Sequence, residues 1–229
     1  MKAHKREVPR CLERTNAARR KEENLCLHEG TLRRSYDSAN FIGSGYPCLV
    51  QADLCLERTD IEVLNCGVSG NRVTDLLSRW KKDCIDVQPD ILSILIGVND
   101  AWKEVTQQED TDGELFEETY RVLLRYTKRM LPKTRIILLG AYLTHGTETD
   151  DKWDGLYKET AIRNAITHRL AAEFGTEFLD LQKLFDEACK KLPPEHWTQD
   201  GVHPTAAGHR LLANAWENKM QTALVAVKK

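Results

Sequence analysis

The sequence predicts a three-layer α/β/α sandwich built on a parallel sheet. Short apolar runs alternate with longer amphipathic stretches along most of the 229 residues. The most apolar run, residues 90–96, lacks polar alternation, as expected for a strand covered on both faces. Strands separated by helix-length segments are joined by right-handed crossovers, which place helices on both faces of the sheet. The length suits a single domain of this kind.

Five apolar runs are the expected strands, the first of them weak: residues 24–27, 61–64, 90–96, 134–139 and 176–180. The segments between them favour helices. One covers 46–58 and has Pro47 in its first turn, where the missing N–H costs nothing. Another lies near 73–80, where apolar residues follow the i, i+3, i+4, i+7 spacing of a buried helix face. The remaining predicted helices cover 114–131, 156–174, 181–191 and about 205–226.

Composition and charge exclude several classes of protein. The chain is 41% hydrophobic and 30% charged, with a net charge of −2, which is typical of a globular protein. It has no apolar run long enough for a transmembrane helix. We therefore expect neither a membrane nor a nucleic acid as partner. Residues 1–34 carry ten Lys or Arg and five Asp or Glu. We interpret residues 1–23 as a basic, poorly ordered extension and 24–229 as the folded domain.

The seven cysteines are scattered, odd in number and without a C-x-x-C pair. This pattern favours mostly buried thiols in a reducing compartment, and hence a cytoplasmic protein, over a disulfide framework or a zinc site. We expect no metal and no organic cofactor. The oligomeric state is left open.

The residues that follow the strands are the candidates for chemistry, because parallel sheets hold their sites at the carboxyl ends of the strands. In Asp200-Gly-Val-His203, His203 can act as general base while Asp200 orients its imidazole. The N–H of Gly70 and the side-chain amide of Asn99 can donate to an oxyanion. Each motif also has a purely structural interpretation. Gly70 can be a turn glycine, Asn99 can cap a helix, and Asp200 with His203 can form a loop hydrogen bond.

These segments resemble three of the four sequence blocks that define the SGNH hydrolases, also called GDSL-type esterases. Gly70 in Gly-Val-Ser-Gly-Asn-Arg resembles the oxyanion glycine of block two, and Asn99 in Ile-Gly-Val-Asn-Asp the oxyanion asparagine of block three. Asp200 and His203 in Asp-Gly-Val-His-Pro resemble the catalytic pair of the last block. The resemblance implies a five-stranded, flavodoxin-like parallel sheet. It also implies an acylhydrolase that cleaves small carboxylic esters, including acetylated sugars, by Ser-His-Asp-type acyl transfer.

Block one departs from the family pattern, which has Gly-Asp-Ser after the first strand with the serine as nucleophile. Here Thr31 and Leu32 follow Gly30, and no Gly-Asp-Ser occurs in the chain. The nucleophile therefore stays unassigned, with Thr31, Ser35 and Ser69 as weak substitutes. The alternatives are a non-catalytic, ligand-binding pseudo-hydrolase and an ordinary α/β-hydrolase that uses Ser69. A frameshift upstream of about residue 35 would account for the missing block.

Two further features lie near the predicted strand ends. An acidic loop, residues 148–154, follows the fourth strand and is long enough to shape a pocket. Four aromatic residues can serve either as platforms for sugar rings or as packing groups: Trp102, Tyr142, Trp153 and Trp197.

Overall fold

The computed structural model describes residues 23–28, 42–109 and 113–226, with the side chains of 23–28 and 222–226 left out. Its sheet comprises β1 (Glu23–His28), β2 (Ile61–Asn65), β3 (Ile91–Leu95), β4 (Arg135–Leu139) and β5 (Glu177–Leu179). All pair in parallel, in the order β2-β1-β3-β4-β5. The predicted α/β class is confirmed. Because the strands are parallel, their carboxyl ends meet at one edge of the sheet.

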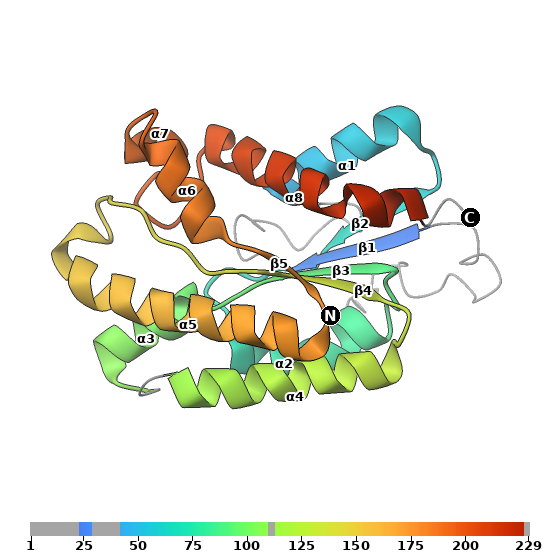
Figure 1. Cartoon of the computed structure of the whole chain (residues 1–229), viewed down its shortest axis with the longest axis horizontal. Coiled ribbons are helices and arrows are strands. Elements are labelled where there is room, and N and C mark those ends of the chain that lie inside the picture. The colour runs from blue at the N-terminus through green and yellow to red at the C-terminus, as the bar shows by residue number, and fades with distance from the viewer. Residues whose placement is uncertain (1–22, 29–41, 110–112, 227–229) are drawn as a thin grey trace, which may run out of the picture.

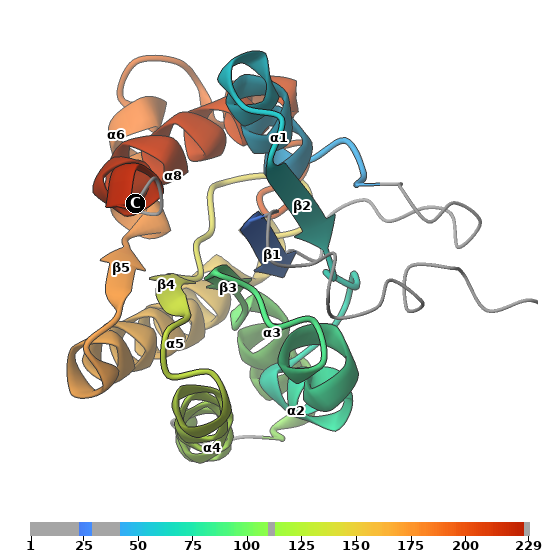
Figure 2. The same cartoon turned by 90° about the vertical axis from the view of Figure 1, so that its right-hand side faces the viewer.

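The helices form a layer on each face of the sheet (Figures 1 and 2). One layer contains α1 (Tyr46–Glu57), α6 (Leu181–Cys189), α7 (Pro194–Trp197) and α8 (Ala206–Ala226). The other contains α2 (Val73–Trp80), α3 (Val98–Gln107), α4 (Glu114–Met130) and α5 (Trp153–Phe174). A π-turn, η3 (Lys81–Ile85), extends α2, and a 3₁₀ turn, η5 (Asp150–Lys152), precedes α5.

Each face of the sheet has its own hydrophobic core, because successive side chains of a strand point to opposite faces. Leu92 and Ile94 of β3 belong to the core under α2, α4 and α5, whereas Ile91 packs with the α1, α6 and α8 layer. Ser93 is fully buried on that second side. Its hydroxyl is satisfied by Trp216 Nε1 and the Tyr46 hydroxyl, each at 3.2 Å.

The predicted helices lie within a few residues of those observed, but α3 and α7 have no counterpart among them. Of residues 97–100, which follow β3, only Gly97 precedes α3, because that helix begins at Val98. Gly97 has φ of +124°, a conformation that favours glycine. A Cβ there would lie 3.3 Å from Phe116 and 3.4 Å from Ala141. The backbone conformation and the close packing thus both favour glycine at position 97.

The predicted extension, residues 1–23, lies outside the described residues except for Glu23, which is the first residue of β1. No helix in the described part of the chain is long and apolar enough to cross a membrane.

Candidate active site

A cavity of about 480 Å³ opens at the carboxyl edge of the sheet. The segments after β2, β3 and β4 and the loop before α8 line it together. It brings together the four residues singled out in the sequence: Gly70, Asn99, Asp200 and His203. Segments separated by up to 133 positions (203 − 70) thus share one cavity.

Asp200 and His203 form a hydrogen-bonded pair within a tight loop. Asp200 Oδ2 lies 2.7 Å from His203 Nδ1. Its Oδ1 accepts from the backbone N–H groups of Val202 and His203, both at 2.9 Å. Partial burial acts to raise the pKa of Asp200, but these donors outweigh burial and hold it below the ordinary value of 3.8. The carboxylate therefore stays ionised next to the imidazole, which is half exposed.

The loop between β4 and α5 forms hydrogen bonds with the backbone of the Asp200–His203 loop. The N–H of Glu148 donates to the Asp200 carbonyl at 3.0 Å, and that of Thr144 to the Gly201 carbonyl at 2.9 Å. Gly201 has φ of +102°, and a Cβ there would lie 2.3 Å from Thr149 Oγ1. The close approach of the two loops thus requires glycine at position 201.

Gly70 and Asn99 face the same cavity from the carboxyl ends of β2 and β3, the two strands that flank β1. Gly70 has φ of +81°, and no atom lies within 4 Å of a Cβ built there. Asn99 lies in the first turn of α3 and donates from Nδ2 to the carbonyl of Asn71 at 3.1 Å. An amide nitrogen carries two protons, so one N–H of Asn99 is left for a ligand.

Asp100, the residue after Asn99 in α3, is buried. Its Oδ1 accepts from the N–H of Val73, the first residue of α2, at 3.2 Å. Burial raises its pKa to about 7, against the opposing effects of the Val73 N–H and the charge of Arg163. Asp100 thereby joins the start of α2 to the start of α3.

A second histidine–carboxylate pair lies in the β4–α5 loop. His145 Nδ1 is 2.8 Å from Asp150 Oδ1, and both side chains are about 60% exposed. Neither residue lines the cavity. The histidine–aspartate distance alone therefore does not distinguish the candidate pair. The distinction comes from the cavity and from the two backbone N–H groups on Asp200.

The four aromatic residues singled out in the sequence divide into two groups. Trp102 and Tyr142 line the cavity. The Tyr142 hydroxyl donates to the Val202 carbonyl at 3.0 Å. Trp153 stacks against His145 at 3.8 Å, and Trp197 donates to a backbone carbonyl; neither contributes to the cavity lining. The acidic loop contributes Glu148 to the cavity.

Of the three substitute nucleophiles, Thr31 and Ser35 lie outside the described residues. Ser69 is exposed and lines the cavity. The register of the sheet bears on the other two, because Leu27 of β1 pairs with Asn65 and Ser93. The chain therefore leaves β1 at the edge of the sheet that carries the cavity.

Arg79 lines the cavity from α2 and was not among the residues predicted from the sequence. The apolar spacing of this helix identifies its buried face, but it does not show which polar side chains face a cavity. Among the described residues, no group of three or more His, Cys, Asp or Glu side chains is arranged to hold a metal ion.

A model of the GDSL-like lipase/acylhydrolase family matches residues 33–211. An acetylxylan esterase from Geobacillus stearothermophilus is 33% identical over 181 residues, covering 76% of this chain and 80% of that protein.

Solved structures show the same likeness. A GDSL-like lipase from Parabacteroides merdae superposes with a TM-score of 0.78 at 35% identity, covering 88% of this chain and 96% of that one. The Geobacillus esterase superposes with a TM-score of 0.72 at 29% identity, covering 87% and 94%. Structures described as catalytic mutants of that esterase replace an Asp, a His three residues later, and a Ser.

Proposed function

The chain belongs to the GDSL-like lipase/acylhydrolase family and is a carboxylic ester hydrolase; from this premise we propose that it deacetylates sugars through Asp200, His203, Gly70 and Asn99. The observation that carries the proposal is the single cavity shared by these four residues. The similar acetylxylan esterase supports the substrate class. Its catalytic mutants, at an Asp and a His three residues apart, match the spacing of Asp200 and His203.

The proposed base is Nε2 of His203. With Nδ1–H donated to Asp200, the lone pair of the neutral imidazole lies on Nε2. His203 takes the proton of the attacking hydroxyl and returns it to the leaving alcohol. Asp200 fixes the tautomer and stabilises the imidazolium that forms. The N–H of Gly70 and the free N–H of Asn99 stabilise the tetrahedral oxyanion.

The proposed source of the nucleophile is the segment that follows β1, because the chain leaves β1 at the cavity edge. In this segment Thr31 and Leu32 occupy the places of Asp and Ser after Gly30. Ser69 is the alternative nucleophile among the described residues. The second candidate function is a non-catalytic binding protein for acetylated sugars, which the missing Gly-Asp-Ser favours.

The decisive experiment compares the native chain with the Thr31→Asp/Leu32→Ser variant on p-nitrophenyl acetate and on acetylated xylo-oligosaccharides. We expect the double variant to raise kcat/KM by at least about 10³-fold, since a triad that lacks its nucleophile loses about 10⁶-fold in kcat. Adding His203→Ala should abolish the gain. No turnover in either chain, with retained binding of the acetylated sugar, would favour the binding protein. Native turnover lost on Ser69→Ala would identify Ser69 instead.

We propose a cytoplasmic location. The free cysteines at positions 48, 55, 66, 84 and 189 support it, and cell fractionation tests it. We also propose that residues 24–229 act as one domain, with a small ester and no nucleic acid as partner. A single cooperative unfolding transition is the expected result.

A further inference from the structure

Arg79 connects the two ends of the loop that carries Gly70. Its Nε donates to Asn71 Oδ1 at 3.0 Å, and its Nη1 donates to the Cys66 carbonyl at 2.7 Å. Nη1 also forms an ion pair with Asp83, one turn further along. The guanidinium thus spans residues 66–71, which we name the oxyanion loop.

The position of Asn71 bears on both proposed oxyanion donors. Asn71 directly follows Gly70, and its carbonyl accepts the hydrogen bond from Asn99 Nδ2 at 3.1 Å. A shift of Asn71 would move the Gly70 N–H and would also release the Asn99 amide. Arg79 holds the side chain of this same residue.

The backbone of the oxyanion loop includes two glycines and lies outside the helices and strands. It contains Gly67 and Gly70, and Gly70 adopts a positive φ and is exposed. Besides the bond from Asn99, the Gly67 N–H donates to Asn65 Oδ1 at 2.9 Å and the Asn71 N–H to the Val68 carbonyl at 3.3 Å. Glycine-containing backbone has more conformations available than other backbone. Oxyanion donors, however, accelerate a reaction only when they are held in place beforehand.

We propose that Arg79 is a positioning residue that holds the oxyanion loop, and with it the Gly70 and Asn99 donors, in the geometry that fits the transition state. This inference rests on the proposed function of those two donors. The planar guanidinium suits the task because it donates to two differently placed acceptors at once, whereas the ammonium of lysine is a point charge.

Arg79→Lys, Arg79→Ala and the control Arg121→Ala test the proposal, in the native chain and in the Thr31→Asp/Leu32→Ser background. Arg121 is 19% exposed and Arg79 21%, so the control removes an equally buried guanidinium. We expect both Arg79 variants to lower kcat by about 10- to 100-fold, somewhat less than removal of a whole donor. KM should change by less than about 3-fold, because the loss arises only in the transition state. Arg121→Ala should leave both constants unchanged.

Amide hydrogen exchange supplies a readout that needs no turnover. The Asn71 N–H, bonded to Val68, should exchange at least about 10-fold faster in both Arg79 variants, while the amides of β3 keep their protection. Arg79→Ala could lower the protection of amides throughout the molecule by destabilising the fold. In that case the test uses Arg79→Lys, which keeps the positive charge opposite Asp83.

Parental kcat and parental Asn71 exchange in Arg79→Lys would overturn the proposal. A raised KM with unchanged kcat would overturn it too, since it would assign Arg79 to substrate binding. Faster exchange without loss of kcat in an active background would show that the loop tolerates the motion, and would also overturn it. Failure of the proposed function differs from all of these, because it shows as absent hydrolysis in the parent while the exchange result stands.

Discussion

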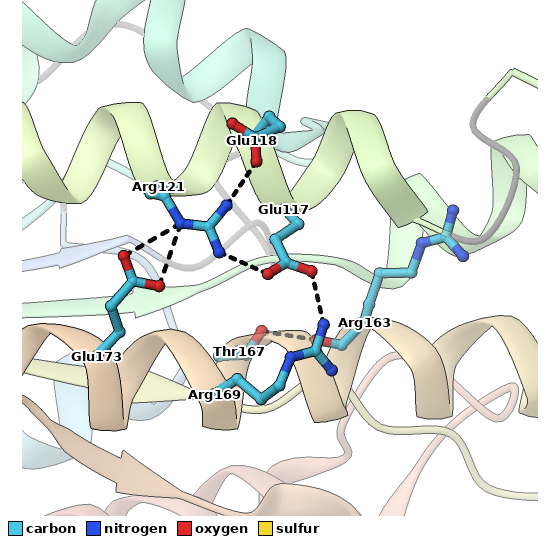
Figure 3. Close-up of polar contacts among 7 residues, drawn as sticks. All are labelled: Glu117, Glu118, Arg121, Arg163, Thr167, Arg169 and Glu173. Atoms are coloured by element: carbon cyan, nitrogen blue, oxygen red, sulfur yellow. Dashed lines mark hydrogen bonds and ion pairs between the residues drawn. The ribbon is translucent and has the colours of Figure 1, made fainter.

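Arg79 and Arg121 have nearly the same exposure, but they hold different kinds of partner. Arg121 on α4 binds only carboxylates: Glu117 and Glu118 at 2.6 Å and Glu173 on α5 at 3.1 Å (Figure 3). Arg169 adds a further bond to Glu117 at 2.6 Å. Arg79 also pairs with one carboxylate, that of Asp83, but its other two partners are a backbone carbonyl and an amide side chain of a loop. Two arginines of nearly equal burial therefore differ in what they hold: Arg121 joins side chains of two helices, and Arg79 holds a loop.

The difference lies in what moves when the guanidinium is removed. The carboxylates around Arg121 sit on α4 and α5, whose backbones are held by their own hydrogen bonds, so the freed side chains can turn to water. Glu118 and Glu173 are 66% and 44% exposed, and ion pairs with such solvent-exposed partners contribute about 0–1 kcal/mol. The acceptors of Arg79 belong to a loop without such a ladder, so its loss changes the backbone itself. We expect the cavity edge to be sensitive to substitution and the α4–α5 face to be tolerant.

The largest expected effect is that of Asp200→Asn at the cavity edge. The substitution keeps the shape but disfavours the His203 tautomer with its lone pair on Nε2, which in a comparable triad lowers kcat by about 10⁴-fold. We expect a loss of that order in the most active background, measured as kcat on p-nitrophenyl acetate. Asp150→Asn, in the pair with His145 outside the cavity, is the control and should have no effect. Equal losses in both variants would show that the cavity does not distinguish the pairs.

Gly201→Ala should come next, because it forces apart the two loops that set Asp200. The new Cβ would meet Thr149 Oγ1 at 2.3 Å and the Thr144 carbonyl at 2.7 Å. We expect the free energy of unfolding to fall by about 2–4 kcal/mol and kcat to fall with it. Gly175→Ala is the control, with φ of +58° but no atom within 4 Å, and should cost only about 1 kcal/mol. Urea unfolding of both variants makes the measurement. Equal costs would mean that backbone conformation, and not the close approach, matters at position 201.

Asp100→Asn should change stability in a pH-dependent way. The pKa of Asp100 is about 7 in the folded protein against an ordinary 3.8, so the folded state holds its proton more tightly. Stability from this group is complete at low pH and is lost as the pH rises from about 4 through 7. The neutral amide avoids that loss, so the variant should gain about 1–3 kcal/mol relative to the parent between pH 5 and pH 8.

Thermal unfolding at the two pH values measures this gain. Asp151→Asn, at an exposed position, provides the control and should give the same difference from the parent at both. A gain for Asp100→Asn that is no larger at pH 8 than at pH 5 would contradict the assignment of a buried, strained carboxylate.

Arg121→Ala should have the smallest effect, below about 1 kcal/mol at low salt and less at high salt, because Glu118 and Glu173 are open to solvent and salt screens their ion pairs. Urea unfolding at two salt concentrations measures it. A loss above about 2 kcal/mol would remove the contrast between the two regions.

Regular secondary structure and local motifs could be predicted from the sequence. The nearly all-apolar run at 90–96 predicted β3, and the spacing of Val73, Leu76 and Trp80 predicted α2, whose buried residues are these three. The Asp200–His203 spacing placed two side chains in one tight loop, where three residues of separation suffice to bring them within hydrogen-bonding distance.

Other features could not be predicted because they depend on elements far apart in the chain. The α3 helix begins directly after Gly97, where the φ of +124° and the close packing of Phe116 and Ala141 favour glycine. His145 and Asp150 also form a close pair, and only the position of the cavity separates them from Asp200 and His203.

The sequence alone determined the α/β class, most of the strands and helices, and the strand-end segments that carry the candidate chemistry, because periodicity and short motifs are local properties of the chain. Only the tertiary structure decided that Arg79 reaches the oxyanion loop and that Asp100 is buried with a raised pKa. The physical reason is that hydrogen-bond partners and desolvation depend on which distant segments pack around a side chain.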